Sequence, residues 1–145
     1  MSENTVNTIR EFLTRMKLNF SYDAERKSFI LPYTISDKRF SVYINVGDPW
    51  ITVVALLAKV QDLPPSVNKE ALYARLLQDT FYLNEVTFGL TKNGDIVTHT
   101  EAHASALNFE DFSIEFQAVV YGISHFINKI MKDFPIKPAI STLYV

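Results

Sequence analysis

The spacing of hydrophobic residues changes several times along the chain, and each change predicts a new element. Apolar residues recur every three or four positions in Val6–Met16, which predicts an amphipathic helix. The period then becomes two and predicts four consecutive strands, built on Phe20–Tyr22, Phe29–Leu31, Phe40–Val46 and Trp50–Val60. Because Pro32 cannot donate a hydrogen bond, we expect the second strand to end there or to lie at a sheet edge.

The second half of the chain contains two further stretches with helical spacing. After Pro64-Pro65, Ser66 or Asn68 can cap a helix whose predicted buried stripe consists of Leu72, Tyr73, Leu76, Leu77, Thr80 and Leu83. Asn108 can cap a longer final helix. Its main apolar stripe consists of Phe109, Phe112, Phe116, Val119, Val120, Ile123, Ile127 and Ile130.

Between these helices, Asn93-Gly94 is the sharpest local signal in the sequence. The strand-like runs Glu85–Leu90 and Ile96–Ala102 flank it. Asn-Gly is the preferred pair of a type I′ turn, because both central residues of that turn need positive φ. We therefore predict a type I′ hairpin at this point.

Together these elements predict an α+β fold in the order α-β-β-β-β-α-β-β-α. Three helices would pack with an antiparallel sheet of about five or six strands. A chain of 145 residues, 48% of them hydrophobic, has the size and apolar content of one domain, which we place at residues 1–134. Residues 135–145 contain two prolines and an apolar end, and they predict an extended C-terminal tail that docks on another surface.

Two elements carry more apolar surface than a two-layer fold needs. Trp50–Val60 is apolar on both faces, as in a central strand covered on both sides or one whose second face meets another subunit. The final helix has a second apolar cluster nearly opposite its main stripe, and Gly122 beside it predicts close approach of another backbone. The candidate partner or dimer surface comprises Trp50, Thr52, Val54, Leu56, Ile114, Ala118 and Tyr121.

Charge and composition exclude several classes of function. The net charge is -2 with acids and bases interspersed, so the basic footprint that nucleic acid requires is missing. The absence of cysteine excludes disulfides and thiolate chemistry. Met1–Thr8 lacks the pattern of a signal peptide, and the longest apolar run, Val53–Ala58, is too short to cross a bilayer. We therefore predict a soluble, cytoplasmic protein without membrane insertion.

No group of residues predicts a reaction. His99 is placed on a strand and His103 in the following loop, so their spacing does not align two rings on a metal. His125 has no acidic residue one helical turn away, and Glu110-Asp111 is explained as charge at a helix start. There is no nucleophile elbow and no phosphate-binding glycine loop. We predict no catalytic residues, no cofactor and no metal.

The arrangement of elements across Asn4–Lys132 resembles the YbjN family, which shares a fold with the class I chaperones of type III secretion. The resemblance rests on the opening helix, the strands in Phe20–Val60, the Asn93-Gly94 hairpin and the helix that begins at Phe109. It implies a homodimer that binds segments of partner proteins on its sheet and helices and has no catalytic site. The strongly apolar Trp50–Val60 and the tail from Pro135 depart from the resemblance.

The sequence therefore favours a non-catalytic, chaperone-like or adaptor protein that binds a protein partner as a homodimer. The alternative is a small-molecule-binding domain or an enzyme, with a pocket between the sheet and the helices. Polar residues that could line such a pocket are Tyr43, His99, Glu101 and His125.

Overall fold

The structure is a computed structural model that describes residues 2–138. The chain begins with helix α1 (Ser2–Arg15), and four strands follow: β1 (Ser21–Asp23), β2 (Ser28–Ile35), β3 (Lys38–Val46) and β4 (Trp50–Lys59). Helix α2 (Lys69–Tyr82) precedes the strands β5 (Phe88–Leu90) and β6 (Asp95–His103). Helix α3 (Phe109–His125) continues through a π-helical turn at Phe126–Ile130 into the short α4 (Met131–Asp133).

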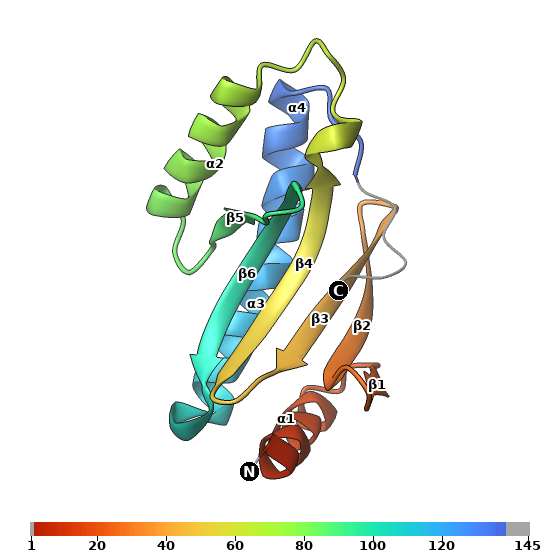
Figure 1. The fold of residues 1–145 in the computed structure, drawn as a ribbon, viewed down its shortest axis with the longest axis vertical. Coiled ribbons are helices and arrows are strands. Elements are labelled where there is room, and N and C mark those ends of the chain that lie inside the picture. The colour runs from red at the N-terminus through yellow and green to blue at the C-terminus, as the bar shows by residue number, and fades with distance from the viewer. Residues whose placement is uncertain (1, 139–145) are drawn as a thin grey trace.

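The six strands within residues 2–138 form one antiparallel sheet in the order β1-β2-β3-β4-β6-β5. The predicted α+β class and order of elements are confirmed. Strand β4 lies between β3 and β6, as its apolar sequence predicts for a central strand. In Figure 1, β4 and β6 pass in front of α3, while α2 lies beside the edge strand β5.

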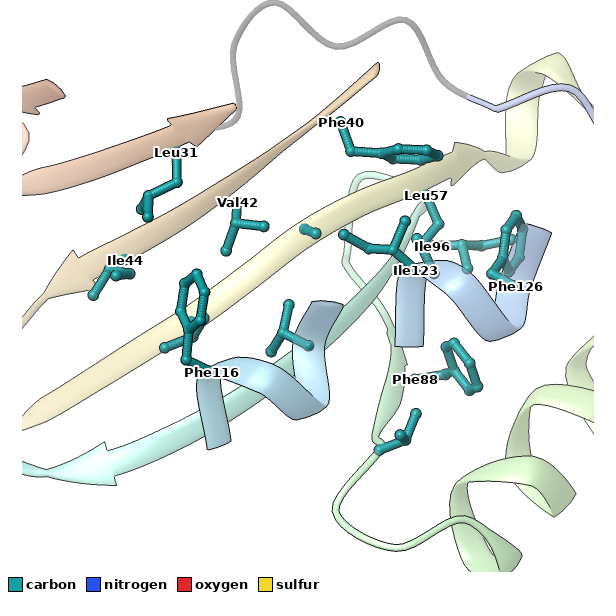
Figure 2. Packing of buried hydrophobic residues seen from close by; sticks show 14 of the residues in the cluster. Leu31, Phe40, Val42, Ile44, Leu57, Phe88, Ile96, Phe116, Ile123 and Phe126 are labelled. Carbon is teal, nitrogen blue, oxygen red and sulfur yellow. The ribbon is translucent and has the colours of Figure 1, made fainter. Parts of the chain in front are cut away.

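One face of the sheet carries the main hydrophobic core. Helix α1 contributes Ile9 and Leu13, and α3 contributes residues such as Phe116 and Ile123, all of them fully or almost fully buried. Figure 2 shows side chains of the strands and of α3 meeting in this core. The predicted helix caps are present as well, because the side chain of Asn68 accepts from the backbone of α2 and that of Asn108 from the backbone of α3.

Two hairpins differ from the expected turn chemistry. Gly94 has a φ of 84°, but Asn93 is not among the residues with positive φ, so the type I′ prediction was wrong. The Gly94 amide donates to the Thr91 carbonyl, and the Thr91 amide donates to the Asp95 carbonyl, which fits a turn closed by one left-handed glycine. The turn with two positive φ values instead joins β2 to β3, at Ser36 (51°) and Asp37 (66°).

Two strands are longer than the sequence pattern predicts. Strand β2 continues through Pro32 to Ile35, and its partner β1 pairs only with Ser28–Ile30. The edge alternative for Pro32 therefore holds, because its missing N–H falls on a stretch of β2 that β1 does not reach. Strand β6 includes His103, which was predicted to lie in the following loop.

The predicted C-terminal tail is described only at its beginning. Ile136 is buried and joins the main hydrophobic core, and its amide donates to the carbonyl of Phe134. The apolar end of the predicted tail, residues 139–145, lies outside the described residues.

Helix α3 lies close to the sheet at Gly122. A methyl group at this position would lie 2.3 Å from Oγ1 of Thr98 on β6 and 3.3 Å from Cγ1 of Val86. Thr98 is fully buried, so it has little room to move. Gly122 was expected to allow close approach of another backbone, whereas its nearest neighbour is the side chain of Thr98.

This contact predicts the effect of Gly122→Ala. We expect the substitution to lower the free energy of unfolding by about 1–3 kcal/mol, because the added methyl group overpacks the interface between α3 and β6. The measurement is urea denaturation of the variant with and without Thr98→Ala, which removes the Oγ1 atom that lies nearest to the added methyl group. An equal loss in both backgrounds would show that the Thr98 contact does not set the cost.

Candidate protein-interaction surfaces

The sheet has an outer face, defined here as the face opposite α1 and α3. Residues 50, 52, 54 and 56 of β4 lie on it, because alternate residues of a strand point to opposite faces and residues 51, 53, 55 and 57 belong to the main core. A separate outer-face cluster consists of the buried side chains Tyr43, Val54, Leu56 and Val97. Two of the four predicted β4 residues, Val54 and Leu56, are therefore part of a second small core.

The other end of the outer face is open. Trp50 is 57% exposed, and its ring packs edge-on against that of His103 on the neighbouring strand, with 5.0 Å between the ring centroids. Thr52 lies between Asn45 and Glu101 in the strand register. The outer face thus changes from apolar and buried at Leu56 to aromatic and exposed at Trp50.

The three candidate residues on α3 lie on the other side of the sheet. Ile114 and Tyr121 are about half exposed, whereas Ala118 is buried. Since α3 packs against the core face, the sheet separates them from the four residues of β4. The seven candidates form two surfaces instead of one.

A third apolar surface is exposed on α2 and β5. We call it the α2–β5 patch and define it by Leu77, Phe81, Tyr82 and Leu90, of which Phe81 is 80% and Tyr82 79% exposed. Beside it lies a hollow of about 260 Å³ lined almost entirely by apolar groups. Its walls are formed by Tyr73, Leu76, Leu77, Phe88, Gly89, Leu90 and Ile96.

The α2–β5 patch is absent from the candidate surface predicted from sequence. Leu77 was assigned to the buried stripe of the helix, but it is 71% exposed. A helical projection could have revealed the patch, because at 100° per residue Phe81 lies about 180° from the fully buried Leu72. Two adjacent aromatic residues that lie off the buried stripe at the end of a helix can therefore indicate an exposed apolar patch.

A network of charged side chains attaches α2 to the helices next to it. Asp79 accepts from His125 Nε2 at 2.8 Å and from Arg75 Nε at 2.9 Å, and Arg75 Nη1 donates to Asp133 at 2.6 Å. The hydrogen bonds to Asp133 and Asp79 raise the pKa of the Arg75 guanidinium. His125 has no acidic residue one turn away in its own helix, but it contacts Asp79 on α2. This contact links the two helices.

The polar residues of the alternative pocket do not converge as a set. His99 Nδ1 and Glu101 form a close contact on the outer face, where the Glu101 side chain is 44% exposed. Tyr43 lies on the same face. His125, at the end of α3, instead contacts Asp79 of α2. Among the described residues, no group of three or more His, Cys, Asp or Glu side chains could hold a metal ion.

Glu115 on α3 lines a polar hollow of about 310 Å³ together with Glu85 and Glu101. Burial is the main cause that raises the pKa of Glu115, and repulsion from Glu85, Asp111 and Glu101 adds to it. Carboxylates of like charge therefore gather at one edge of the interface between α3 and β6.

Comparisons with solved structures identify the fold. YbjN from E. coli superposes with a TM-score of 0.64 at 15% identity, over 92% of this chain and 96% of that one. A chain of the ExsC–ExsE complex superposes with a TM-score of 0.62 at 14% identity, over 97% and 98% of the two chains. A chain of the complex between the type III secretion chaperone SycH of Yersinia pestis and a fragment of YscM2 has a TM-score of 0.55 at 10% identity, over 82% and 96%.

These similarities show that the chain has the type III secretion chaperone-like fold, as the order of elements predicts. No protein-family model matches the sequence, and no curated protein is significantly similar to it. Within residues 2–138, none of the helices is both long enough and apolar enough to cross a bilayer.

The raised pKa of Glu115 predicts a pH-dependent effect of Glu115→Gln. Because the folded-state pKa lies above the ordinary value of 4.5, the carboxylate lowers the stability of the protein as the pH rises through that window. We expect the variant to be more stable than wild type at pH 7, by less than about 1 kcal/mol because the group is partly exposed. The difference should disappear below the ordinary pKa.

The measurement is the free energy of unfolding in urea at pH 7 and at pH 3.5–4, with Glu25→Gln in the exposed turn between β1 and β2 as a matched control for charge. A stabilisation by Glu115→Gln that is the same at both pH values would contradict the electrostatic explanation.

Proposed function

We propose that the protein is a non-catalytic, chaperone-like adaptor that acts as a homodimer and binds a protein partner. The α2–β5 patch is the observation that carries this proposal. Soluble proteins rarely leave several large aromatic and aliphatic side chains exposed at one place unless that place is an interface. The patch also lies at the edge of the sheet, because β5 is an edge strand that pairs with β6 on one side and with none of the described strands on the other.

The occupant that we propose for this patch is a second copy of the chain. A two-fold dimer uses the same surface on both subunits, so that surface must contain both projections and hollows. The exposed rings of Phe81 and Tyr82 are projections, and the apolar space between Leu76 and Phe88 is a hollow beside them. Pairing two such patches would place aromatic rings of one subunit in the hollow of the other.

The partner protein is assigned to the open end of the outer face. Trp50 there offers a large exposed ring, and tryptophan is enriched among the residues that dominate binding energy in protein interfaces. Several of the superposed structures are complexes, among them ExsC with ExsE and SycH with a fragment of YscM2. They support a protein-binding role for the fold, while Ile114 and Tyr121 on α3 are a second candidate surface for the partner.

For the dimer, the decisive substitution is Phe81→Glu. It places a charge in the centre of the proposed interface, and we expect it to weaken dimerisation at least tenfold because a carboxylate would have to be buried without a partner. Sedimentation equilibrium at micromolar concentration measures the change. Ile114→Glu is the matched control, since it also adds a charge at an exposed aliphatic site.

Two results would contradict the proposed dimer. One is a wild-type protein that stays monomeric at these concentrations. The other is loss of the dimer in Ile114→Glu with an unchanged dimer in Phe81→Glu, which would move the interface to α3.

For the partner, we predict that Trp50→Glu weakens binding at least tenfold while the dimer persists. Tagged wild-type protein, Trp50→Glu and Tyr121→Glu are used for affinity capture with mass spectrometry, and each recovered protein is then purified and titrated calorimetrically against all three. A true partner should bind wild type and lose at least tenfold in affinity on Trp50→Glu. Selective loss on Tyr121→Glu would assign the partner to α3, and equal binding to all three would refute both surfaces.

A further inference from the structure

A groove of about 410 Å³ lies between α1 and the hairpin that joins β1 to β2. In Figure 1, α1 lies next to this hairpin, at the opposite end of the molecule from α2. The wall of the groove consists of Glu3, Val6, Asn7 and Arg10 from α1 and of Tyr22, Ala24 and Lys27 from the hairpin. A hollow of this size lies within the range of small-molecule sites in proteins, and it shares no residue with the α2–β5 patch or the outer-face cluster.

Aromatic rings hold Arg10 in the wall of this groove. Its Cζ atom lies 5.1 Å from the ring centroid of Tyr22 and 5.6 Å from that of Phe29, which is fully buried. Nη1 of Arg10 donates to Oδ1 of Asn7 at 3.2 Å. The guanidinium is therefore oriented by its own surroundings, and it has further N–H groups in a planar fork that matches a carboxylate or a phosphate.

Lys27 places a second positive charge in the wall, on the hairpin side. Its φ is 52°, a conformation that is uncommon for lysine and in which glycine and asparagine are more usual. The carbonyl of Lys27 accepts from the amide of Val46 at 2.9 Å, so its backbone is tied to β3. The groove thus has one cation on each side, and each comes from an anchored position.

The acidic residues near the groove do not neutralise Arg10. Within residues 2–138, no carboxylate forms an ion pair with this side chain. Glu3 is the only acid among the described wall residues, and it lies two helical turns or about 10 Å before Arg10 on α1. Asp23 of the hairpin pairs with Arg26 instead. Positive charge therefore prevails where the groove is closed by Arg10.

We propose that this groove binds a small molecule that carries a carboxylate or phosphate group on an apolar or aromatic body. The anionic group lies between Arg10 and Lys27, where charge-assisted hydrogen bonds are available, and the body contacts Val6 and Tyr22. Because such a ligand bridges α1 and the hairpin, it also stabilises the folded protein. The site is independent of the proposed adaptor function.

Nuclear magnetic resonance titration of the full-length protein tests the site. The probes are phenyl phosphate and benzoate, which represent the two anionic groups, and the neutral benzyl alcohol controls for the ring alone. Arg10→Gln and Lys27→Gln each remove one cation from the groove. Arg15→Gln is the matched control, since Arg15 is also on α1 with its Cζ atom 4.0 Å from a ring centroid, that of Phe109, but does not line the groove.

We expect at least one of the two anions to shift the amide resonances of Asn7, Tyr22 and Ala24 saturably at millimolar concentration. Arg10→Gln should weaken this binding at least tenfold and Lys27→Gln at least threefold, whereas Arg15→Gln should leave it unchanged. Whichever anion binds wild type more tightly identifies the preferred group. Lys27→Gln, at an exposed turn position, serves as the test if Arg10→Gln does not fold by circular dichroism.

Three results would overturn the proposed site. One is the absence of saturable shifts with both anions. Another is equally tight binding of benzyl alcohol, which would show that the ring is bound without the charge. The third is an equal loss of affinity in Arg15→Gln, which would show that the net charge of α1, and not the groove, attracts the anion.

Discussion

The close packing of α3 against the sheet is the contact on which the rest of the structure depends. It is possible because Gly122 has no side chain, and Thr98 of β6 occupies the space that a Cβ atom would need. With α3 this close, Phe116 and Ile123 reach the core between the helices and the strands. All the described helices that contribute to this core lie on one side of the sheet. The other side of β4 therefore does not contact them. The one-sided packing thus creates the outer face.

The same packing also determines where the additional apolar residues of β4 and α3 lie in the structure. The second face of β4 does not meet α3, and its residues Val54 and Leu56 join Tyr43 and Val97 in a separate cluster. Ala118, which belongs to the minor apolar cluster of α3, is buried, whereas Ile114 and Tyr121 are half exposed. The additional apolar residues, which the sequence suggests form one surface, are therefore divided between the two sides of the sheet.

The sequence predicts the order of elements because hydrophobic spacing directly reflects which side of each element faces the core. It predicts turns less well. Asn93-Gly94 has the composition of a type I′ turn, but the surrounding loop positions only Gly94 in the left-handed region, while Ser36-Asp37 adopts positive φ values without a glycine. The α2–β5 patch was missed because the sequence analysis assigned α2 a broad buried stripe that includes Leu77, although a helical projection places Phe81 opposite the buried Leu72.

The charged network between α2 and its neighbours bears on how the α2–β5 patch could serve as an interface. An exposed patch binds well when its backbone is already ordered, because little conformational entropy is then lost on association. Asp79 is held by His125 on α3 and by Arg75, which also reaches Asp133. These contacts lie on the side of α2 that faces α3 and α4, whereas Phe81 points away from the buried Leu72. The network can therefore hold the helix in place without occupying the apolar side that a second subunit would need.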